Sequence, residues 1–155
     1  MAPARVTLLA GIIALSAGCG IGPNDNSGGD EKRGSAKKMP LGVPVHDRLD
    51  RAGGDTTDWK VFTVPVYETI MTLNAWWDNP DIVATITVRD QFGGQMYKLK
   101  HQIGQRKESW GNIRVREGSY FLEIESDTGG SVYTLEIELD EGGPQRTPGA
   151  IPRPE

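Results

Sequence analysis

The sequence predicts an all-β protein built as one antiparallel β-sandwich. In the central part of the chain, apolar and polar residues alternate with a period of two, the period of side chains along a strand. Clusters of Gly, Asn, Asp and Pro separate the alternating runs at a spacing typical of sandwiches. No segment carries apolar residues at the spacing of an amphipathic helix. The alternating part spans residues 41–140 of 155, a common length for a single hydrophobic core.

The first 18 residues have the layout of a secretory signal peptide. One charged residue, Arg5, precedes an apolar stretch, residues 6–15, that is too short to span a bilayer. The sole cysteine of the sequence, Cys19, follows the small residues Ala17 and Gly18. The segment therefore resembles a bacterial lipoprotein signal. An ordinary signal peptide with a chance cysteine near its cleavage site is the alternative.

The resemblance to a lipoprotein signal implies that the thiol of Cys19 is acylated, for example with palmitate, and anchors the chain in a lipid bilayer. Two or more acyl chains hold a protein stably in a membrane, whereas one does so only marginally. Gly20 stands where an aspartate would imply retention at the inner membrane, so the outer membrane is the expected location. Because Cys19 would carry lipid, the exported domain would have no disulfide and would depend on its core.

Two segments flank the predicted domain. Residues 19–40 contain mostly Gly, Ser, Asn, Pro and charged residues, with too little apolar surface to offset the entropy of ordering. We expect them to form a flexible linker with a reach of about 25 Å, which holds a folded head above the membrane. Residues 141–155 contain four prolines and are predicted to form an extended, disordered tail.

The alternation predicts seven or eight short strands between the flanks. They cover residues 43–49, 59–64, 69–76, 82–90, 96–103, 113–116, 120–125 and 133–139. The apolar faces of the four clearest strands are Ile82, Ala84, Ile86 and Val88; Tyr97, Leu99 and Ile103; Tyr120, Leu122 and Ile124; and Tyr133, Leu135, Ile137 and Leu139. Turns are predicted at residues 79–80, 91–94, 117–118 and 127–130.

Three segments resemble the bacterial pre-peptidase C-terminal domain: residues 55–65 (DTTDWKVFTVP), 117–124 (EGSYFLEI) and 131–137 (SVYTLEI). The resemblance implies a jelly-roll-like β-sandwich of the kind often appended to secreted peptidases. Lys60 stands where that family usually has an aromatic residue, and residues 78–81 replace a more aspartate-rich run. The sequence shows no peptidase domain beside the module, so an accessory role would be exercised in trans.

The sequence argues against an enzyme and against nucleic-acid binding. Its two histidines are His46, which precedes Asp47, and His101, which shares strand parity with Leu99. Adjacent residues of a strand point to opposite faces, so His46 and Asp47 make a poor catalytic pair, and His101 is expected to be partly buried. No nucleophile, metalloprotease or phosphate-loop motif is present. The net charge of −4 and the pI near 5.2 disfavour a nucleic-acid partner.

A calcium site is a candidate at the entry to the domain. Four aspartates crowd this part of the sequence: Asp47, Asp50, Asp55 and Asp58. Calcium takes several oxygen ligands that converge from loops, and some modules that this chain resembles bind it. The alternative is that these are solvated carboxylates that cap turns through backbone amides.

A contact surface is predicted around Trp76, Trp77, Asp78 and Asn79. The two tryptophans point to opposite faces of a strand end, so one of them is expected outside the core, while Trp59 and Trp110 are expected to be structural. The predicted function is that of a membrane-anchored, non-enzymatic accessory module that contacts another envelope or surface protein. The alternative is a carbohydrate- or peptidoglycan-binding module that uses exposed tryptophan, and a third possibility is that the rings only fill the core.

Overall fold

The computed structural model of the chain describes residues 28–140, which form strands, turns and two short 3₁₀ helices. The elements are η1 (Arg33–Ser35), β1 (Lys37–Lys38), β2 (Val45–Asp50), η2 (Arg51–Gly53), β3 (Thr57–Trp77), β4 (Val83–Arg89), β5 (Gln95–Lys100), β6 (Lys107–Thr128) and β7 (Gly130–Leu139). The predicted all-β class is confirmed. Within residues 28–140, no helix is long and apolar enough to cross a bilayer. The predicted signal, Cys19 and the predicted tail lie outside the described residues.

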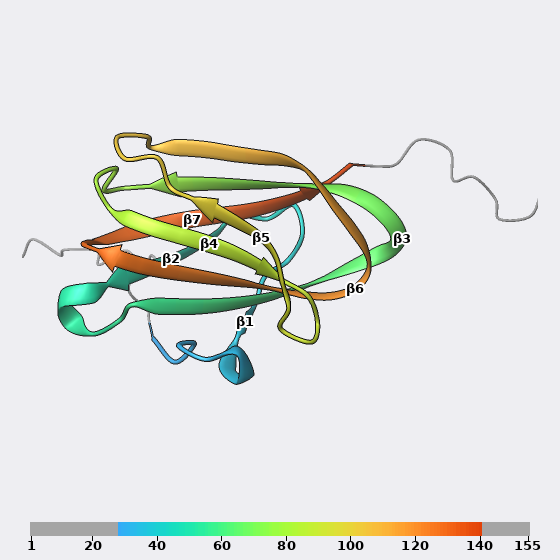
Figure 1. The fold of residues 1–155 in the computed structure, drawn as a ribbon, viewed down its shortest axis with the longest axis horizontal. Coiled ribbons are helices and arrows are strands. Elements are labelled where there is room, and N and C mark those ends of the chain that lie inside the picture. Colours follow the sequence, from blue (N-terminus) through green and yellow to red (C-terminus); the bar gives the residue numbers. More distant parts are fainter. Residues whose placement is uncertain (1–27, 141–155) are drawn as a thin grey trace, which may run out of the picture.

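Two strands, β3 and β6, run the length of the domain and define its architecture. Residues 57–64 of β3 pair with residues 118–125 of β6, and beyond a break in register residues 68–76 pair with residues 107–116. Both strands bend at this break (Figure 1). Pro65 lies in the break, where its missing N–H removes one donor from the ladder.

The sequence predicted each of these long strands as two shorter ones. Residues 117–118, expected to form a turn between strands, lie inside β6. Gly118 has a φ of 147°, a conformation that glycine adopts more easily than any other residue. The dipeptide therefore bends the strand without ending it.

The bends fold one continuous sheet, with the strand order β2-β7-β3-β6-β4-β5, into two layers (Figure 1). The first layer consists of β1, the first half of β3, the second half of β6, β4 and β5. The second layer consists of β2, β7, the second half of β3 and the first half of β6. All pairings are antiparallel except that of β1 with β3.

The core lies between the layers and contains the apolar faces that the alternation predicted. Fully buried side chains come from both layers and include Leu73, Ile86, Leu122 and Ile137. Burying an aliphatic side chain of this size stabilises a fold by about 1.5–3 kcal/mol. One predicted core residue, Ile103, is 64% exposed because β5 ends at Lys100.

The N-terminal segment, residues 28–39, packs on the sandwich, whereas its composition predicted a flexible linker. Strand β1 pairs in parallel with β3 through Lys37 opposite Lys60 and Lys38 opposite Val61. The backbone N–H of Met39 donates to the carbonyl of Val61 at 2.9 Å, and the Met39 side chain is buried in the core. The folded unit therefore begins before residue 41, because strand pairing supplies contacts that composition does not reveal.

Candidate functional site

Trp76 and Trp77 end β3 and lie on opposite faces of the second layer. Trp77 is only 2% exposed, and its Nε1 donates a hydrogen bond to Glu108 Oε2 at 3.0 Å. Its ring lies 4.9 Å from that of His101 and 5.9 Å from that of Tyr133. The predicted contact surface must therefore be corrected: Trp77 belongs to the core, and only Trp76 lies on the outer face.

Trp76 lies at the centre of a polar row that crosses the second layer. The row crosses four neighbouring strands in the order β2, β7, β3 and β6. His46 of β2 pairs with Thr134 of β7, and Thr134 pairs with Trp76 of β3. Trp76 in turn pairs with Lys107 of β6. His46 Nδ1 lies 2.7 Å from Thr134 Oγ1, and Lys107 Nζ lies 5.1 Å from the centre of the Trp76 ring. We call these four residues, His46, Thr134, Trp76 and Lys107, the Trp76 face. They offer a half-buried aromatic ring flanked by groups that donate and accept hydrogen bonds.

Asp78 and Asn79 follow Trp77 and hold the turn between β3 and β4. Asn79 donates from its backbone to Ser131 Oγ at 2.9 Å and from its side-chain amide to the carbonyl of Gly130 at 3.0 Å. The backbone of Asp78 is bonded to Val132 and to the side chain of Arg106. Both residues are exposed, but the Asn79 side chain ties this turn to β7.

The two histidines lie in different surroundings. His46 is exposed on the Trp76 face. The side chain of His101 is fully buried, with Nδ1 at 2.6 Å from Glu108 Oε2 and Nε2 at 2.9 Å from the carbonyl oxygen of Pro80. Both ring nitrogens of His101 are thus engaged within the fold. Strand parity predicted partial burial in a sheet, whereas the side chain is fully buried and follows the end of β5 at Lys100.

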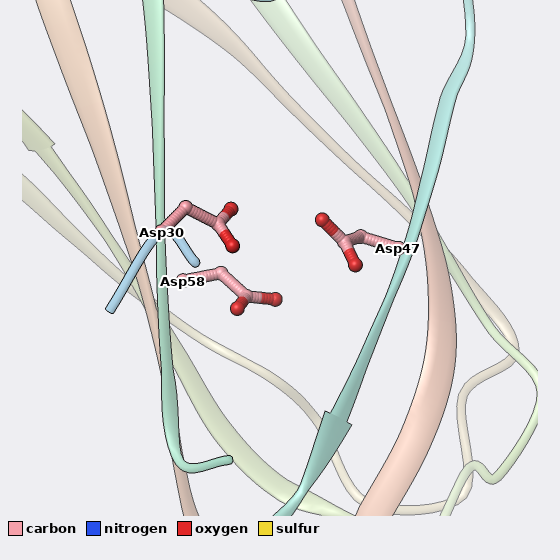
Figure 2. A group of neighbouring side chains, drawn as sticks. All are labelled: Asp30, Asp47 and Asp58. Carbon is pink, nitrogen blue, oxygen red and sulfur yellow. The ribbon is translucent and has the colours of Figure 1, made fainter. Parts of the chain in front are cut away.

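The four aspartates proposed for calcium separate into two groups. Asp47 and Asp58 are buried together between the layers, and the third carboxylate beside them is Asp30, from the N-terminal segment (Figure 2). One carboxylate oxygen from each of the three lies within 4.8 Å of the others. Asp50 instead accepts a hydrogen bond from the backbone N–H of Gly53, and its backbone pairs with that of Asp55.

A lysine ammonium contacts two of these three carboxylates. Lys60, only 1% exposed, places Nζ 2.5 Å from Asp30 Oδ2 and also in contact with Asp47 Oδ2. Lys37, which is half-buried, places its ammonium 3.2 Å from Asp30 Oδ1 and 3.7 Å from Asp47 Oδ2. Tyr133 Oη donates a hydrogen bond to Asp58 Oδ2 at 2.6 Å. Six residues therefore form what we call the Lys60 cluster: Asp30, Lys37, Asp47, Asp58, Lys60 and Tyr133.

Sequence reasoning missed Asp30 and Lys60. Asp30 lies in the segment that was predicted to be a linker, so no local signal marks it. Lys60 did carry a signal, because it shares strand parity with Phe62 and Val64 and therefore points inward. A lysine at an inward position is seldom buried without a carboxylate partner.

Burial and neighbouring charges alter the ionisation of the Lys60 cluster. Burial raises the pKa of Asp58 to about 7, against the lowering effects of the Tyr133 hydrogen bond and the Lys60 charge. Burial, together with the charge of Asp58, raises the pKa of Tyr133 well above its usual value, so the phenol keeps its proton. Burial alone would lower the pKa of Lys60, but hydrogen bonds to Asp30 and Asp47 outweigh it and raise that pKa. Lys60 is therefore an ammonium at neutral pH.

The Lys60 cluster does not fit calcium while Lys60 is in place. Calcium takes six to eight oxygen ligands at about 2.3–2.6 Å. The ammonium of Lys60 already contacts two of the three carboxylates at hydrogen-bonding distance, in the position that a bridging ion would need. The charge that a metal ion would bring to Asp30 and Asp47 is supplied by the chain itself.

No family model matches the chain, and no curated protein matches its sequence. Among solved structures, it is similar to the pre-peptidase C-terminal domain of the collagenase of Bacillus anthracis, with 21% identity and a TM-score of 0.55 over 66% of this chain and 93% of that one. It is also similar to the Yersinia pseudotuberculosis-derived mitogen, with 10% identity and a TM-score of 0.44 over 70% and 93% of the two chains. Aeromonas hydrophila PliG, a periplasmic inhibitor of g-type lysozyme, has 8% identity and a TM-score of 0.41 over 67% and 95%. The first likeness supports the predicted pre-peptidase C-terminal-like sandwich as a fold.

Proposed function

We propose that this chain is a lipid-anchored, non-enzymatic binding module of the bacterial cell envelope, and that the Trp76 face contacts a partner protein there. The observation that carries the proposal is the position of Trp76. The ring is on the outer face of the second layer, outside the core that Trp77 helps to fill from the same strand. Tryptophan is enriched among the residues that dominate protein interfaces.

The surroundings of Trp76 favour a protein partner over a saccharide. Sugars bind tryptophan by stacking on an open face of the ring. Here the ammonium of Lys107 lies over the ring at 5.1 Å from its centre, so a sugar stacking on that side would have to displace it. In a protein interface, the same lysine remains beside the ring and its charge is available to a carboxylate of the partner.

A binding role also agrees with the surroundings of the histidines. His101 is buried with both nitrogens bonded, and His46 contacts a threonine hydroxyl on an open face. General acid–base catalysis requires a side chain that can reach a substrate proton, and the buried His101 does not meet this requirement. His46 is exposed, but the carboxylate next to it in sequence, Asp47, is buried against Lys60. The anchoring part of the proposal rests on Cys19 and the signal-like segment before it.

The test is photo-crosslinking in cells from the Trp76 face, with the crosslinked protein identified by mass spectrometry. Trp76→Ala should weaken the crosslink at least about tenfold. Trp59→Ala is the matched control, because Trp59 is a half-buried tryptophan of the same strand on the outer face of the other layer, against Phe121 and Arg89. Equal crosslinking by the two variants would refute the assigned contact surface. A saturable change in tryptophan fluorescence with muropeptides or polysaccharides, absent from Trp76→Ala, would instead establish the saccharide-binding alternative.

A further inference from the structure

We infer that Lys60 is a built-in cation that fastens the N-terminal segment to the sandwich, so that this attachment requires no divalent metal ion. The inference is independent of the proposed partner and of the lipid anchor. It rests on the position of one ammonium group among carboxylates from three separate parts of the chain.

The ammonium of Lys60 joins three elements that are distant in sequence. It extends from the first half of β3, in the first layer, and bonds to Asp47 of β2, in the second layer. It also bonds to Asp30 of the N-terminal segment, 30 residues earlier in the chain. One side chain thus connects both layers and the incoming segment at a site where all three groups are buried.

The charges show why a cation is needed at this position. Asp30 and Asp47 are both buried, and an unpaired buried carboxylate is strongly unfavourable. The two ammonium groups of Lys60 and Lys37 balance these two carboxylates. Asp58 is left without a counter-charge of its own and is bonded to the neutral phenol of Tyr133. Without Lys60, the cluster would contain three buried carboxylates and the single half-buried ammonium of Lys37.

The backbone of the N-terminal segment is attached at the same place. The N–H of Trp59 donates to the carbonyl of Asp30 at 2.8 Å, next to Lys60 in β3. Strand β1 follows with only two paired residues, and Met39 adds one more hydrogen bond to Val61. So short a ladder is weak by itself. The contact of Asp30 with Lys60 and that of Lys37 with Asp47 are therefore expected to decide whether the segment stays docked.

The experiment uses the full chain with Lys60 replaced in two ways. Lys60→Met keeps the length of the side chain and fills the space without a charge, whereas Lys60→Ala empties the space between the carboxylates. Hydrogen exchange of residues 28–39 and the melting temperature are measured in EDTA and in about 5 mM Ca²⁺, a concentration above the range of weak extracellular calcium modules. Lys38→Ala is the control, because Lys38 lies beside Lys37 in β1 but is exposed and outside the cluster.

We expect the melting temperature and exchange of the unmodified chain to be the same in EDTA and in calcium. Both Lys60 variants should melt about 10 °C or more below it and lose protection in residues 28–39. Calcium should restore part of that protection in Lys60→Ala, where carboxylate oxygens become free to bind it, and none in Lys60→Met. Lys38→Ala should behave as the unmodified chain does.

Three results would overturn the inference. One is a melting temperature of the unmodified chain that falls in EDTA and recovers in calcium, because a metal would then do the fastening. The second is undiminished protection of residues 28–39 in Lys60→Met, and the third is a failure of calcium to restore any protection to Lys60→Ala. Should the Lys60 variants not fold, Asp30→Asn provides the same test: protection must fall in residues 28–39 while the strands of the sandwich keep theirs.

Discussion

Tyr133 and Asp58 are 75 residues apart in sequence and share a hydrogen bond in the interior, with 2.6 Å between Tyr133 Oη and Asp58 Oδ2. The tyrosine comes from β7 in the second layer and the aspartate from the first half of β3 in the first. Burial is the main reason that the pKa of Asp58 rises to about 7, and the charges of Asp47 and Asp30 act in the same direction. The bond therefore connects the two layers through a group that titrates near neutral pH.

We predict that Asp58 makes the fold less stable as the pH rises from about 4 to about 7. Its pKa is about 7 in the folded chain and 3.8 in the reference state, so in this window the folded state binds more protons than the unfolded state. Stability then decreases with rising pH, by at most ~1.4 kcal/mol per pH unit from this one group. Urea unfolding near pH 5 and near pH 8 measures the effect, and Asp58→Asn should lack it. The same pH dependence in both proteins would show that Asp58 does not titrate in this range.

The two adjacent tryptophans should differ in their effect on stability. Trp77→Ala removes a buried ring and leaves Glu108 without one of its donors, so we expect a loss of about 3–5 kcal/mol in the free energy of unfolding. Trp76→Ala removes a half-buried ring from the outer face and should cost about 1 kcal/mol. Chemical denaturation of both variants tests the assignment. Comparable large losses would place Trp76 in the core and remove it from the proposed contact surface.

Cys19→Ser should abolish acylation. If the thiol carries the lipid, labelled palmitate will be incorporated into the unmodified chain and not into the variant. The variant should then partition into the aqueous phase of a detergent extraction. Its head should melt at the same temperature as that of the unmodified chain, since the described fold, residues 28–140, contains no part of this segment. Persistent labelling of Cys19→Ser would disprove the anchor.

The bend of β6 should be sensitive to a methyl group at residue 118. Gly118 has a φ of 147°, which residues with a Cβ rarely adopt, so Gly118→Ala should cost about 1–2 kcal/mol through backbone strain alone. Gly111, in the same strand, serves as the matched control. A Cβ added there would lie 3.5 Å from Thr72 Oγ1, an ordinary contact, and its φ is not positive. Equal unfolding free energies for the two alanine variants would mean that the bend tolerates other residues.

Strand faces could be predicted because they depend on neighbouring residues. The pattern of Tyr133, Leu135 and Ile137 repeats every second residue, and the pleat of any strand sends such residues to one side. Strand continuity was not predictable in the same way. Pro65 and Gly118 are ordinary turn signals, and only the pairing of β3 with β6 on both sides of them decides that each strand continues through a bend.

The polypeptide sequence by itself determined the class of the fold, the faces that pack into the core and the outward position of one of the two residues Trp76 and Trp77, since each follows from alternation along a single strand. The packing of the two layers, which buries Trp77, decided that the outward residue is Trp76. Only the tertiary structure decided that Asp30, Asp47, Asp58 and Lys60 meet. Their carboxylate and ammonium groups come from a segment with few apolar residues and from strands of two different layers. Such a cluster depends on how the sheet bends and on which segment docks at its edge, and these are contacts between residues far apart in the chain.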